Sequence, residues 1–352
     1  MRAFTHNALP GRVVFGAGSL AKLSEEIERL GARRALVLCT PQQREQAQDV
    51  AARLGTRCAG IFDQAVMHVP IETARAARAE ARRLDADCAV AVGGGSTTGL
   101  GKAIALESSL PILAIPTTYA GSEMTPIYGI TEDGLKKTGR DARVLPRTVI
   151  YDPTLTLGLP TGLSATSGMN AIAHAVEALY AEDANPISSM LAAEGIRALR
   201  QGLSRVVAEP LDLEGRSRCL YGAWLCGAVL GSVGMALHHK LCHTLGGSFN
   251  LPHAETHTVV LPHAVAYNRA AAPEAMKLAA AALDAEDAAR ALYALARELG
   301  APLALKDIGM RESDLDRAAE IATKSPYYNP RPVEYGAIRK LLDDAYHGRE
   351  PA

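Results

Sequence analysis

The first 150 residues alternate short apolar runs with helix-like stretches, and this alternation constrains the fold more than any other feature. Apolar runs at 11–18, 35–39, 88–92, 112–115 and 148–151 predict strands. The stretches between them, rich in alanine and charged residues, predict helices at 19–30, 42–54, 70–84 and 97–105. Strands that alternate with helices form a parallel sheet with helices on both faces. The sequence therefore predicts an α/β domain here.

A glycine turn follows the third of these strands. Gly93-Gly94-Gly95-Ser96 comes directly after 88–92, and Thr97 then opens a predicted helix. Glycines let the backbone approach a pyrophosphate, and a helix N-terminus supplies free N–H groups. Three glycines can also form a tight turn alone.

A second polar turn strengthens the nucleotide interpretation. The segment 116–123 (PTTYAGSE) also follows an apolar strand and carries Thr117 and Thr118. Turns at the carboxyl ends of neighbouring parallel strands line one crevice, where such sheets bind nucleotides.

The end of the strand 35–39 bears on the choice of cofactor. An acidic residue often binds the adenosine ribose 2′-hydroxyl at a comparable position, but here the residue is Thr40. A threonine does not repel a 2′-phosphate, so we expect NADH or NADPH to bind. Arg44 is a candidate phosphate contact that makes no strong case for NADPH alone.

Helical signals dominate after residue 153, so we expect two domains, 1–153 and 154–352. The helices predicted in the second half are 167–182, 186–199, 213–230, 273–282, 287–299 and 312–324. A proline-rich stretch at 325–333 (SPYYNPRPV) predicts a loop. Its Tyr327 and Arg331 either face a ligand or pack against the helices.

Histidines concentrate between residues 237 and 263, a stretch that contains six of the ten in the chain: His238, His239, His243, His253, His257 and His263. His239 and His243 are four residues apart, so their side chains share one helix face. Gly246-Gly247 predicts the end of that helix. Such a cluster points to a metal site, an acid–base site or both. The alternative is a polar helix with hydrogen-bonded histidines.

The overall composition excludes several classes of partner. The chain carries 37 basic and 38 acidic residues, which gives no electrostatic case for nucleic acid or an anionic membrane surface. Its six cysteines show no CxxC spacing, and no signal peptide or long apolar run is present. We expect a cytoplasmic protein with reduced thiols.

Taken together, these motifs resemble the iron-containing (group III) alcohol dehydrogenase superfamily over almost the whole chain. They are GGGS at 93–96 with Lys102 six residues later, PTTYAGSE at 116–123, Asp152-Pro153, Asn170 with His174, HxxxH at 239–243, and PHxxxxxxxLPH at 252–263. The resemblance implies a Rossmann-like nucleotide-binding domain, an all-α domain and an active site in the cleft between them. It adds Lys102 to the cofactor-binding residues and implies a homodimer.

The resemblance also implies a divalent metal held by an aspartate and three histidines. His174, His239 and His253 match the three histidines, whereas Asn170 stands where the aspartate is expected. A neutral amide is a poor ligand for Fe²⁺ or Zn²⁺, so we expect no metal. Three imidazoles can still hold Zn²⁺, which leaves a metal-dependent enzyme open. Many members also have aspartate where this chain has Gly99.

In both departures, Asn170 and Gly99, the chain resembles one branch of the superfamily, the maleylacetate reductases. The segments GGGSTTGL, PTTYAGSE and NPRPV are also similar to that branch. That branch reduces the carbon–carbon double bond of maleylacetate to give 3-oxoadipate, in aromatic degradation routes through hydroxyquinol or chlorocatechols. The resemblance implies a small dicarboxylate substrate and a metal-independent reaction with NADH or NADPH.

The resemblance assigns roles within the cluster. His243 matches a histidine near substrate and nicotinamide, and we expect it to be the leading acid or enolate stabiliser, with His253 second. The catalytic set is completed by His174, His239 and Asn170. Tyr327, Arg331 and Lys240 are candidates for binding the substrate. The alternatives are a metal-dependent alcohol or lactaldehyde-type dehydrogenase and a nucleotide-binding sensor without catalysis.

Overall fold

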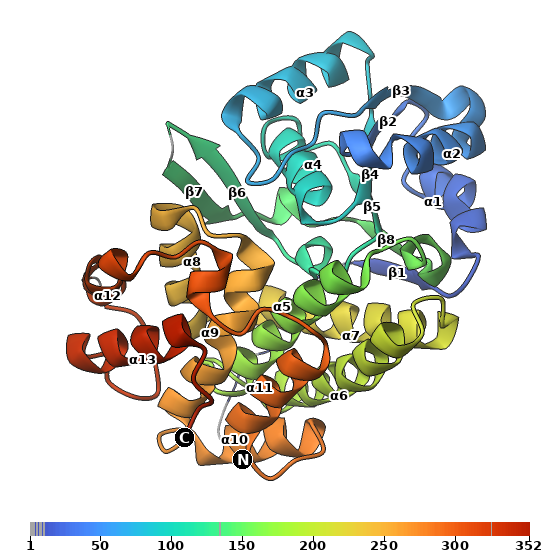
Figure 1. The fold of residues 1–352 in the computed structure, drawn as a ribbon. Coiled ribbons are helices and arrows are strands. Elements are labelled where there is room, and N and C mark those ends of the chain that lie inside the picture. Colours follow the sequence, from blue (N-terminus) through green and yellow to red (C-terminus); the bar gives the residue numbers. More distant parts are fainter. Residues whose placement is uncertain (1–3, 5, 7–8, 10, 134, 325) are drawn as a thin grey trace. The chain divides into compact units, whose positions relative to one another are not determined.

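The computed structural model describes residues 4, 6, 9, 11–133, 135–324 and 326–352 (Figure 1). The chain divides into two compact units: the first ends at Leu159, and the second comprises Pro160–Ala352 together with Phe4 and His6. The 3-10 helix Pro153–Thr156, which follows the expected boundary at residue 153, lies in the first unit. Each unit has its own core, and the two are described separately.

A six-stranded parallel sheet forms the centre of the first unit, as the sequence predicts. The strand order is β1-β8-β5-β4-β2-β3, with bounds Arg12–Phe15, Thr148–Tyr151, Ile112–Pro116, Cys88–Gly93, Ala35–Leu38 and Cys58–Phe62 in that order. The prediction missed β3, an edge strand that is only half-buried and contains Gly60. A short, partly exposed strand has no continuous apolar run to mark it.

Helices cover both faces of this sheet, because successive strand residues point to opposite sides. Val37 of β2 packs with α1 (Leu23–Arg29) and α2 (Arg44–Leu54) in one core cluster. Its neighbours Leu36 and Leu38 pack with α3 (Ile71–Arg83) and α4 (Gly95–Ser108) in another. The predicted parallel sheet with helices on both faces is therefore confirmed.

A separate antiparallel hairpin was not predicted from the sequence. It pairs β6 (Ile127–Glu132) with β7 (Leu135–Arg140). Gly129 of β6 pairs with Thr138, and Gly139 of β7 pairs with Tyr128. The two glycines interrupt the alternation of apolar and polar residues that marks a strand in sequence.

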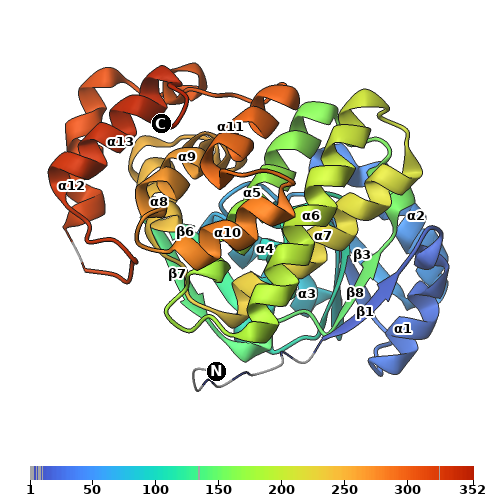
Figure 2. The same cartoon turned by 90° about the horizontal axis from the view of Figure 1, so that it is seen from below.

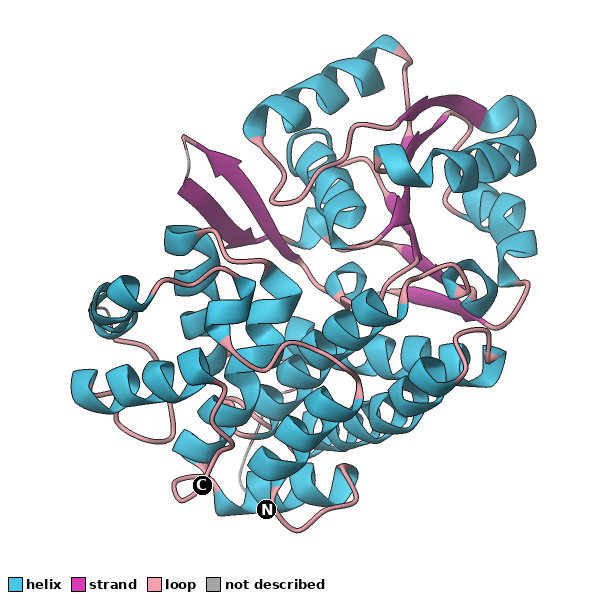
Figure 3. Ribbon diagram, in the orientation of Figure 1, coloured by secondary structure: helices cyan, strands magenta, loops and turns pink. Residues whose placement is uncertain are grey.

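The second unit is helical throughout its described residues, which confirms the all-α prediction (Figure 3). Its helices are α5 Thr161–Leu179, α6 Pro186–Ala208, α7 Leu213–Ser232, α8 Leu237–Phe249, α9 His253–Asn268, α10 Pro273–Ala282, α11 Ala288–Glu298, α12 Leu315–Thr323 and α13 Tyr335–His347. No single described helix is long and apolar enough to cross a bilayer; α7 and α8 reach the required length and hydropathy only together, across a 95° bend.

Three features of this unit correct the predictions. The helix α8 continues through Gly246-Gly247 and ends at Phe249, where the next residue, Asn250, has a left-handed φ of 55°. The helix α9 was missed because it is buried almost all round and contains Pro262, so no one-sided apolar stripe marks it. The helix α13 was also missed, although its buried stripe has a helical spacing.

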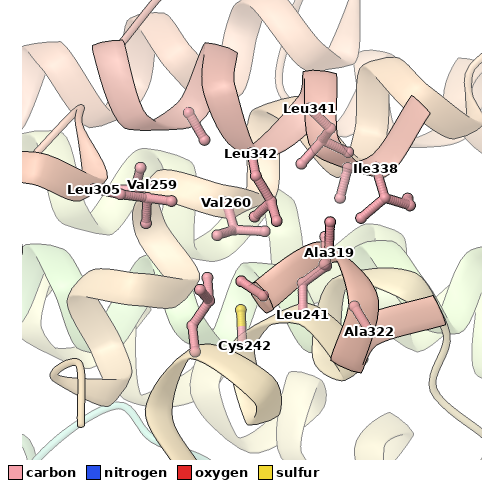
Figure 4. Close-up of a cluster of buried hydrophobic side chains, with 14 of the residues drawn as sticks. Leu241, Cys242, Val259, Val260, Leu305, Ala319, Ala322, Ile338, Leu341 and Leu342 are labelled. Atoms are coloured by element: carbon pink, nitrogen blue, oxygen red, sulfur yellow. The ribbon is translucent and has the colours of Figure 1, made fainter. Parts of the chain in front are cut away.

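An apolar cluster holds α8 and α9 against the last two helices. Leu241 and Cys242 of α8 meet Val260 of α9, together with side chains from α12 and α13 such as Ala319 and Leu342 (Figure 4). The same four helices lie side by side in Figure 2. This core fixes the two helices that carry most of the histidines.

Candidate active site

The glycine turn lies between β4 and α4, and its backbone requires glycine. Gly93 has a φ of 148°, and a Cβ added there would lie 2.5 Å from both Gln43 Oε1 and Thr97 Oγ1. Gly94 is the N-cap residue of α4 and has no side chain to cap it, and Gly95, the first residue of the helix, is exposed. The first N–H groups of α4 are therefore available to an anion, as phosphate binding requires.

Polar side chains from the ends of two neighbouring strands of the turn, β2 and β5, meet beside it. Thr40 follows β2 and its hydroxyl lies 3.2 Å from Gln43 Oε1, while Gln43 Nε2 donates to Thr117 Oγ1 over 2.7 Å. A Cβ on Gly94 would lie 2.9 Å from the Thr118 side chain. The sequence did not single out Gln43, which has no charge or motif to mark it.

The order of the strands explains why the glycine turn is a suitable place for a ligand. The strands β2 and β4 are neighbours, but the chain leaves β2 toward β3 and leaves β4 toward β5, in opposite directions along the sheet. Open α/β sheets bind ligands at the carboxyl ends of strands at such a switch point. The predicted residues Thr40, Gly93 and Thr117 are brought together there.

Lys102, assigned to the cofactor set, points into the protein. Its buried amine contacts five oxygen atoms of the segment after β5: three carbonyls (Ser122, Thr125 and Ile127, 2.7–2.8 Å) and the hydroxyls of Thr125 (2.9 Å) and Ser122 (3.3 Å). Burial lowers its pKa to about 7, with nearby Glu123 opposing the shift. This amine holds α4 against that segment, so Lys102 influences a cofactor only by positioning α4.

The histidines of the second unit gather where α5, α8 and α9 meet. Ring centroids lie 5.1 Å apart for His174 and His239, 5.0 Å for His239 and His257, 4.4 Å for His253 and His257, and 6.1 Å for His239 and His243. His174 and His239 are buried, whereas His253 is half-buried and His243 is exposed. The predicted cluster is thus present, and His257 belongs to it.

A buried carboxylate organises the cluster and was missed by the sequence analysis. Glu177 Oε2 accepts the ring Nδ1–H of His239 over 2.7 Å, and its two oxygens also accept the backbone N–H groups of Ala236 and His238. Burial opposes ionisation of Glu177, but these hydrogen bonds and the nearby histidines outweigh it and lower its pKa to about 2. Glu177 follows His174 by three residues, a helical spacing that could have identified it.

Glu177 determines which atom His239 offers to a ligand. A carboxylate with so low a pKa only accepts hydrogen bonds, so Nδ1 of His239 carries the proton that it receives. The Nε2 atom of His239 is then the one left to act on a ligand. The same carboxylate occupies the N-terminus of α8, where an anion is favoured.

Four buried polar atoms of the cluster have no hydrogen-bond partner within the described chain: Asn170 Oδ1, His174 Nδ1, His239 Nε2 and His257 Nε2. Burial and the neighbouring histidines lower the pKa values of His174 and His257 well below the usual range, so both rings are neutral at pH 7. Buried polar atoms are nearly always paired in folded proteins. Their concentration here is what a ligand-binding site requires.

The residues proposed for substrate binding differ in how far their polar groups already interact with other residues of the protein. Arg331 stacks on the ring of Tyr267 at 4.1 Å and donates to its carbonyl oxygen. Lys240 lies 5.7 Å from the ring of Tyr327, whose buried hydroxyl has no hydrogen-bond partner among the described residues. Tyr327 is therefore better placed than Arg331 to meet a ligand. The expected loop at 325–333 is present, apart from residue 325, which lies outside the described residues.

Comparison with known proteins decides the family. The family model described as iron-containing alcohol dehydrogenase matches residues 10–153, and that of the C-terminal domain of the Fe-containing alcohol dehydrogenase family matches 164–346. The chain belongs to the iron-containing alcohol dehydrogenase family. Within that family it is similar to maleylacetate reductases: 62% identical to that of Burkholderia cepacia over 100% of both chains, and 60% to that of Pseudomonas sp. (strain P51) over 99% of both.

A solved structure gives the same result. The crystal structure of maleylacetate reductase from Agrobacterium tumefaciens is 55% identical, covers 100% of both chains and superposes with a TM-score of 0.97. The fold expected from the resemblance is therefore the fold of this family.

The metal that the family name implies does not fit the donor atoms of this chain. The matching positions supply the amide of Asn170 and three imidazoles, with no negative charge among them. The carboxylate that lies beside them, that of Glu177, is already occupied by His239 and by backbone N–H groups. Divalent iron favours at least one carboxylate in such a set, so these side chains make a poor site for it.

Proposed function

We propose that this chain reduces the carbon–carbon double bond of maleylacetate with NADH or NADPH, giving 3-oxoadipate without a metal ion. The observation that carries the substrate assignment is its similarity to maleylacetate reductases at 55–62% identity over 99–100% of its length. Six thiols outside any disulfide suit a cytoplasmic enzyme. The proposed assembly is a homodimer.

The first unit supports the nucleotide part of the proposal. The proposed phosphate contacts are the glycine turn and the polar residues beside it: Gly93, Gly94, Gly95, Ser96, Thr97, Thr117 and Thr118. Thr40, at the neighbouring strand end, is the proposed ribose contact. Thr97 Oγ1 is buried and has no hydrogen-bond partner in the described chain, as expected of a hydroxyl that waits for a ligand.

The chemistry of the substrate explains why no Lewis acid is needed. When bound, NADH or NADPH supplies a hydride to the alkene carbon β to the ketone of maleylacetate. The electron pair of the double bond then moves toward the ketone oxygen, which becomes an enolate. A proton delivered to the adjacent carbon restores the ketone and completes 3-oxoadipate. The protein must therefore stabilise one oxygen anion and deliver one proton.

The histidine cluster offers both functions. We assign the proton transfer to His243, which is exposed and shares a helix face with His239, with His253 as the second candidate. His174, His239 and Asn170 carry unpaired buried atoms and orient the substrate. Tyr327 and Lys240 are the proposed contacts for a substrate carboxylate, and Arg331 supports the ring of Tyr267 beside them.

Product analysis tests this function. The chain is incubated with maleylacetate and NADH, and the product is identified by NMR. We expect 3-oxoadipate, in which the ketone is intact and the alkene is saturated. A hydroxy acid, or turnover only with simple alcohols and added metal, supports the alcohol or lactaldehyde-type dehydrogenase instead. Nucleotide binding without turnover supports a sensor.

A further inference from the structure

A second pair of histidines lies beside the residues assigned above. His257 follows His253 by one turn of α9, and His238 precedes His239 on α8; both side chains are fully buried. His257 Nδ1 lies 2.9 Å from His238 Nε2, a hydrogen-bond distance. The thiol of Cys242 lies 3.6 Å from His238 Nε2 and 4.0 Å from its Nδ1.

This hydrogen bond allows two arrangements of protons. Neither ring contacts a carboxylate among the described residues, and a fully buried imidazole without such a partner stays neutral. A neutral imidazole carries one proton, so one nitrogen of the pair donates and the other accepts. If His238 donates, the proton of His257 must lie on its Nε2. If His257 donates, its Nε2 has only a lone pair.

The Nε2 atom of His257 is the informative end of the pair. It is buried, has no hydrogen-bond partner in the described chain and belongs to a ring 4.4–5.0 Å from those of His253 and His239. A lone pair there would repel an anionic substrate, whereas an N–H would bind one of its oxygens. The proposed substrate is a dicarboxylate that gains a further negative charge during reduction.

We propose that His257 presents a fixed Nε2–H donor to an anionic oxygen of the substrate. His238 fixes this tautomer by donating a hydrogen bond from its Nε2 to Nδ1 of His257. The inference rests on the proposed function and extends it to two residues. The ligand class is a carboxylate or an enolate oxygen.

Paired substitutions at His257 test the donor. In His257→Gln the amide nitrogen reaches about the position of Nε2, whereas in His257→Asn it reaches only that of Nδ1. We expect kcat/KM to stay within about fivefold of wild type in His257→Gln and to fall on the order of 100-fold in His257→Asn, the scale for losing one anion-stabilising donor. His263→Gln, on the same helix outside the cluster, is the control and leaves kcat/KM unchanged. Equal losses in the Gln and Asn variants would overturn the proposal.

The tautomer is measured separately from turnover. ¹⁵N NMR of histidine-labelled protein, assigned with His257→Gln, should show the proton of His257 on Nε2, and His238→Leu should abolish that preference. A proton on Nδ1 in the wild type overturns the inference even if maleylacetate is reduced. A protein with the expected tautomer and no turnover instead overturns the proposed function.

The same three side chains also have the proximity of metal ligands, since their ligand atoms lie within 4.8 Å of one another. The 2.9 Å separation of the two nitrogens favours a direct hydrogen bond. Zinc titration distinguishes the two: we expect no stoichiometric binding that depends on Cys242. One zinc ion per chain, lost in Cys242→Ala, would contradict the proposed tautomer.

Discussion

Two sets of buried polar groups, one in each unit, differ in how completely they are hydrogen-bonded. In the first unit, the amine of Lys102 contacts five oxygen atoms, and the carboxyl of Glu123 accepts the hydroxyl of Tyr151 over 2.7 Å. In the helical unit, four buried atoms of one histidine cluster have no partner in the described chain. Charged side chains are buried at both sites, but the histidine cluster also leaves hydrogen-bonding atoms without a partner in the described chain.

This contrast distinguishes structural from functional polar groups. A fully bonded buried charge holds elements together, and removing it costs stability. Unpaired buried atoms cost stability as they stand and persist where a ligand uses them. Thr97, the unpaired hydroxyl in the first unit, lies at the glycine turn, so the same criterion marks the proposed nucleotide site.

The largest expected effect is on stability, from Lys102→Met. Five oxygen atoms would lose a charged donor, so we expect the first unit to lose about 3–5 kcal/mol of unfolding free energy. Urea denaturation measures the loss, with Lys22→Met, an exposed lysine, as the control. Unchanged stability with a higher KM for NADH would instead return Lys102 to the cofactor site.

The second effect is catalytic, from His243→Ala. If this exposed ring transfers the proton, we expect kcat to fall by about two orders of magnitude, with little change in stability. Steady-state kinetics and a melting curve measure the two quantities, and His347→Ala, outside the cluster, is the control. A near wild-type kcat would remove His243 from the mechanism and direct attention to His253.

The third effect, from Glu177→Gln, should be smaller. The amide can still accept N–H groups from the start of α8, but it no longer fixes the proton of His239 on Nδ1. We expect kcat to fall on the order of 10- to 100-fold, the range for carboxylates that orient a functional histidine. If the only change is lower stability, Glu177 is a helix cap and nothing more.

The smallest effect concerns acid stability through His263. Burial lowers its pKa to about 4, with Asp344 opposing and Lys340 assisting. The unfolded chain therefore binds this proton more readily, and stability falls as pH drops below the usual histidine pKa toward 4. Between pH 7 and 5.5 we expect a loss of about 1 kcal/mol from this group. His263→Leu should reduce the dependence of the melting temperature on pH; an unchanged slope would show that other groups cause it.

Much of the fold follows from the sequence because the central strands are continuous apolar runs and their helices have one-sided patterns. Where burial is complete or weak, the pattern disappears. The helix α9 is buried nearly all round, and the edge strand β3 is only half-buried, so neither has the expected periodicity.

The residues of the site also differ in how well the sequence identifies them. The histidines and glycines were identifiable because their residue types and spacing carry chemistry. Glu177 and Gln43 act through tertiary contacts with residues more than 50 positions away, and sequence spacing gives only a weak signal for the first and none for the second. Lys102 shows the converse: a motif position predicted a ligand contact, whereas its geometry shows an internal support.

We propose that a histidine cluster with Asn170 in place of a carboxylate works without metal. The most direct measurement is NADH oxidation by maleylacetate, before and after exhaustive chelation, with metal content determined on the same samples. We predict an unchanged rate and substoichiometric metal in the wild type, whereas Asn170→Asp should gain tightly bound iron or zinc. One metal ion per wild-type chain, with activity abolished by chelation and restored by that metal, would contradict the account.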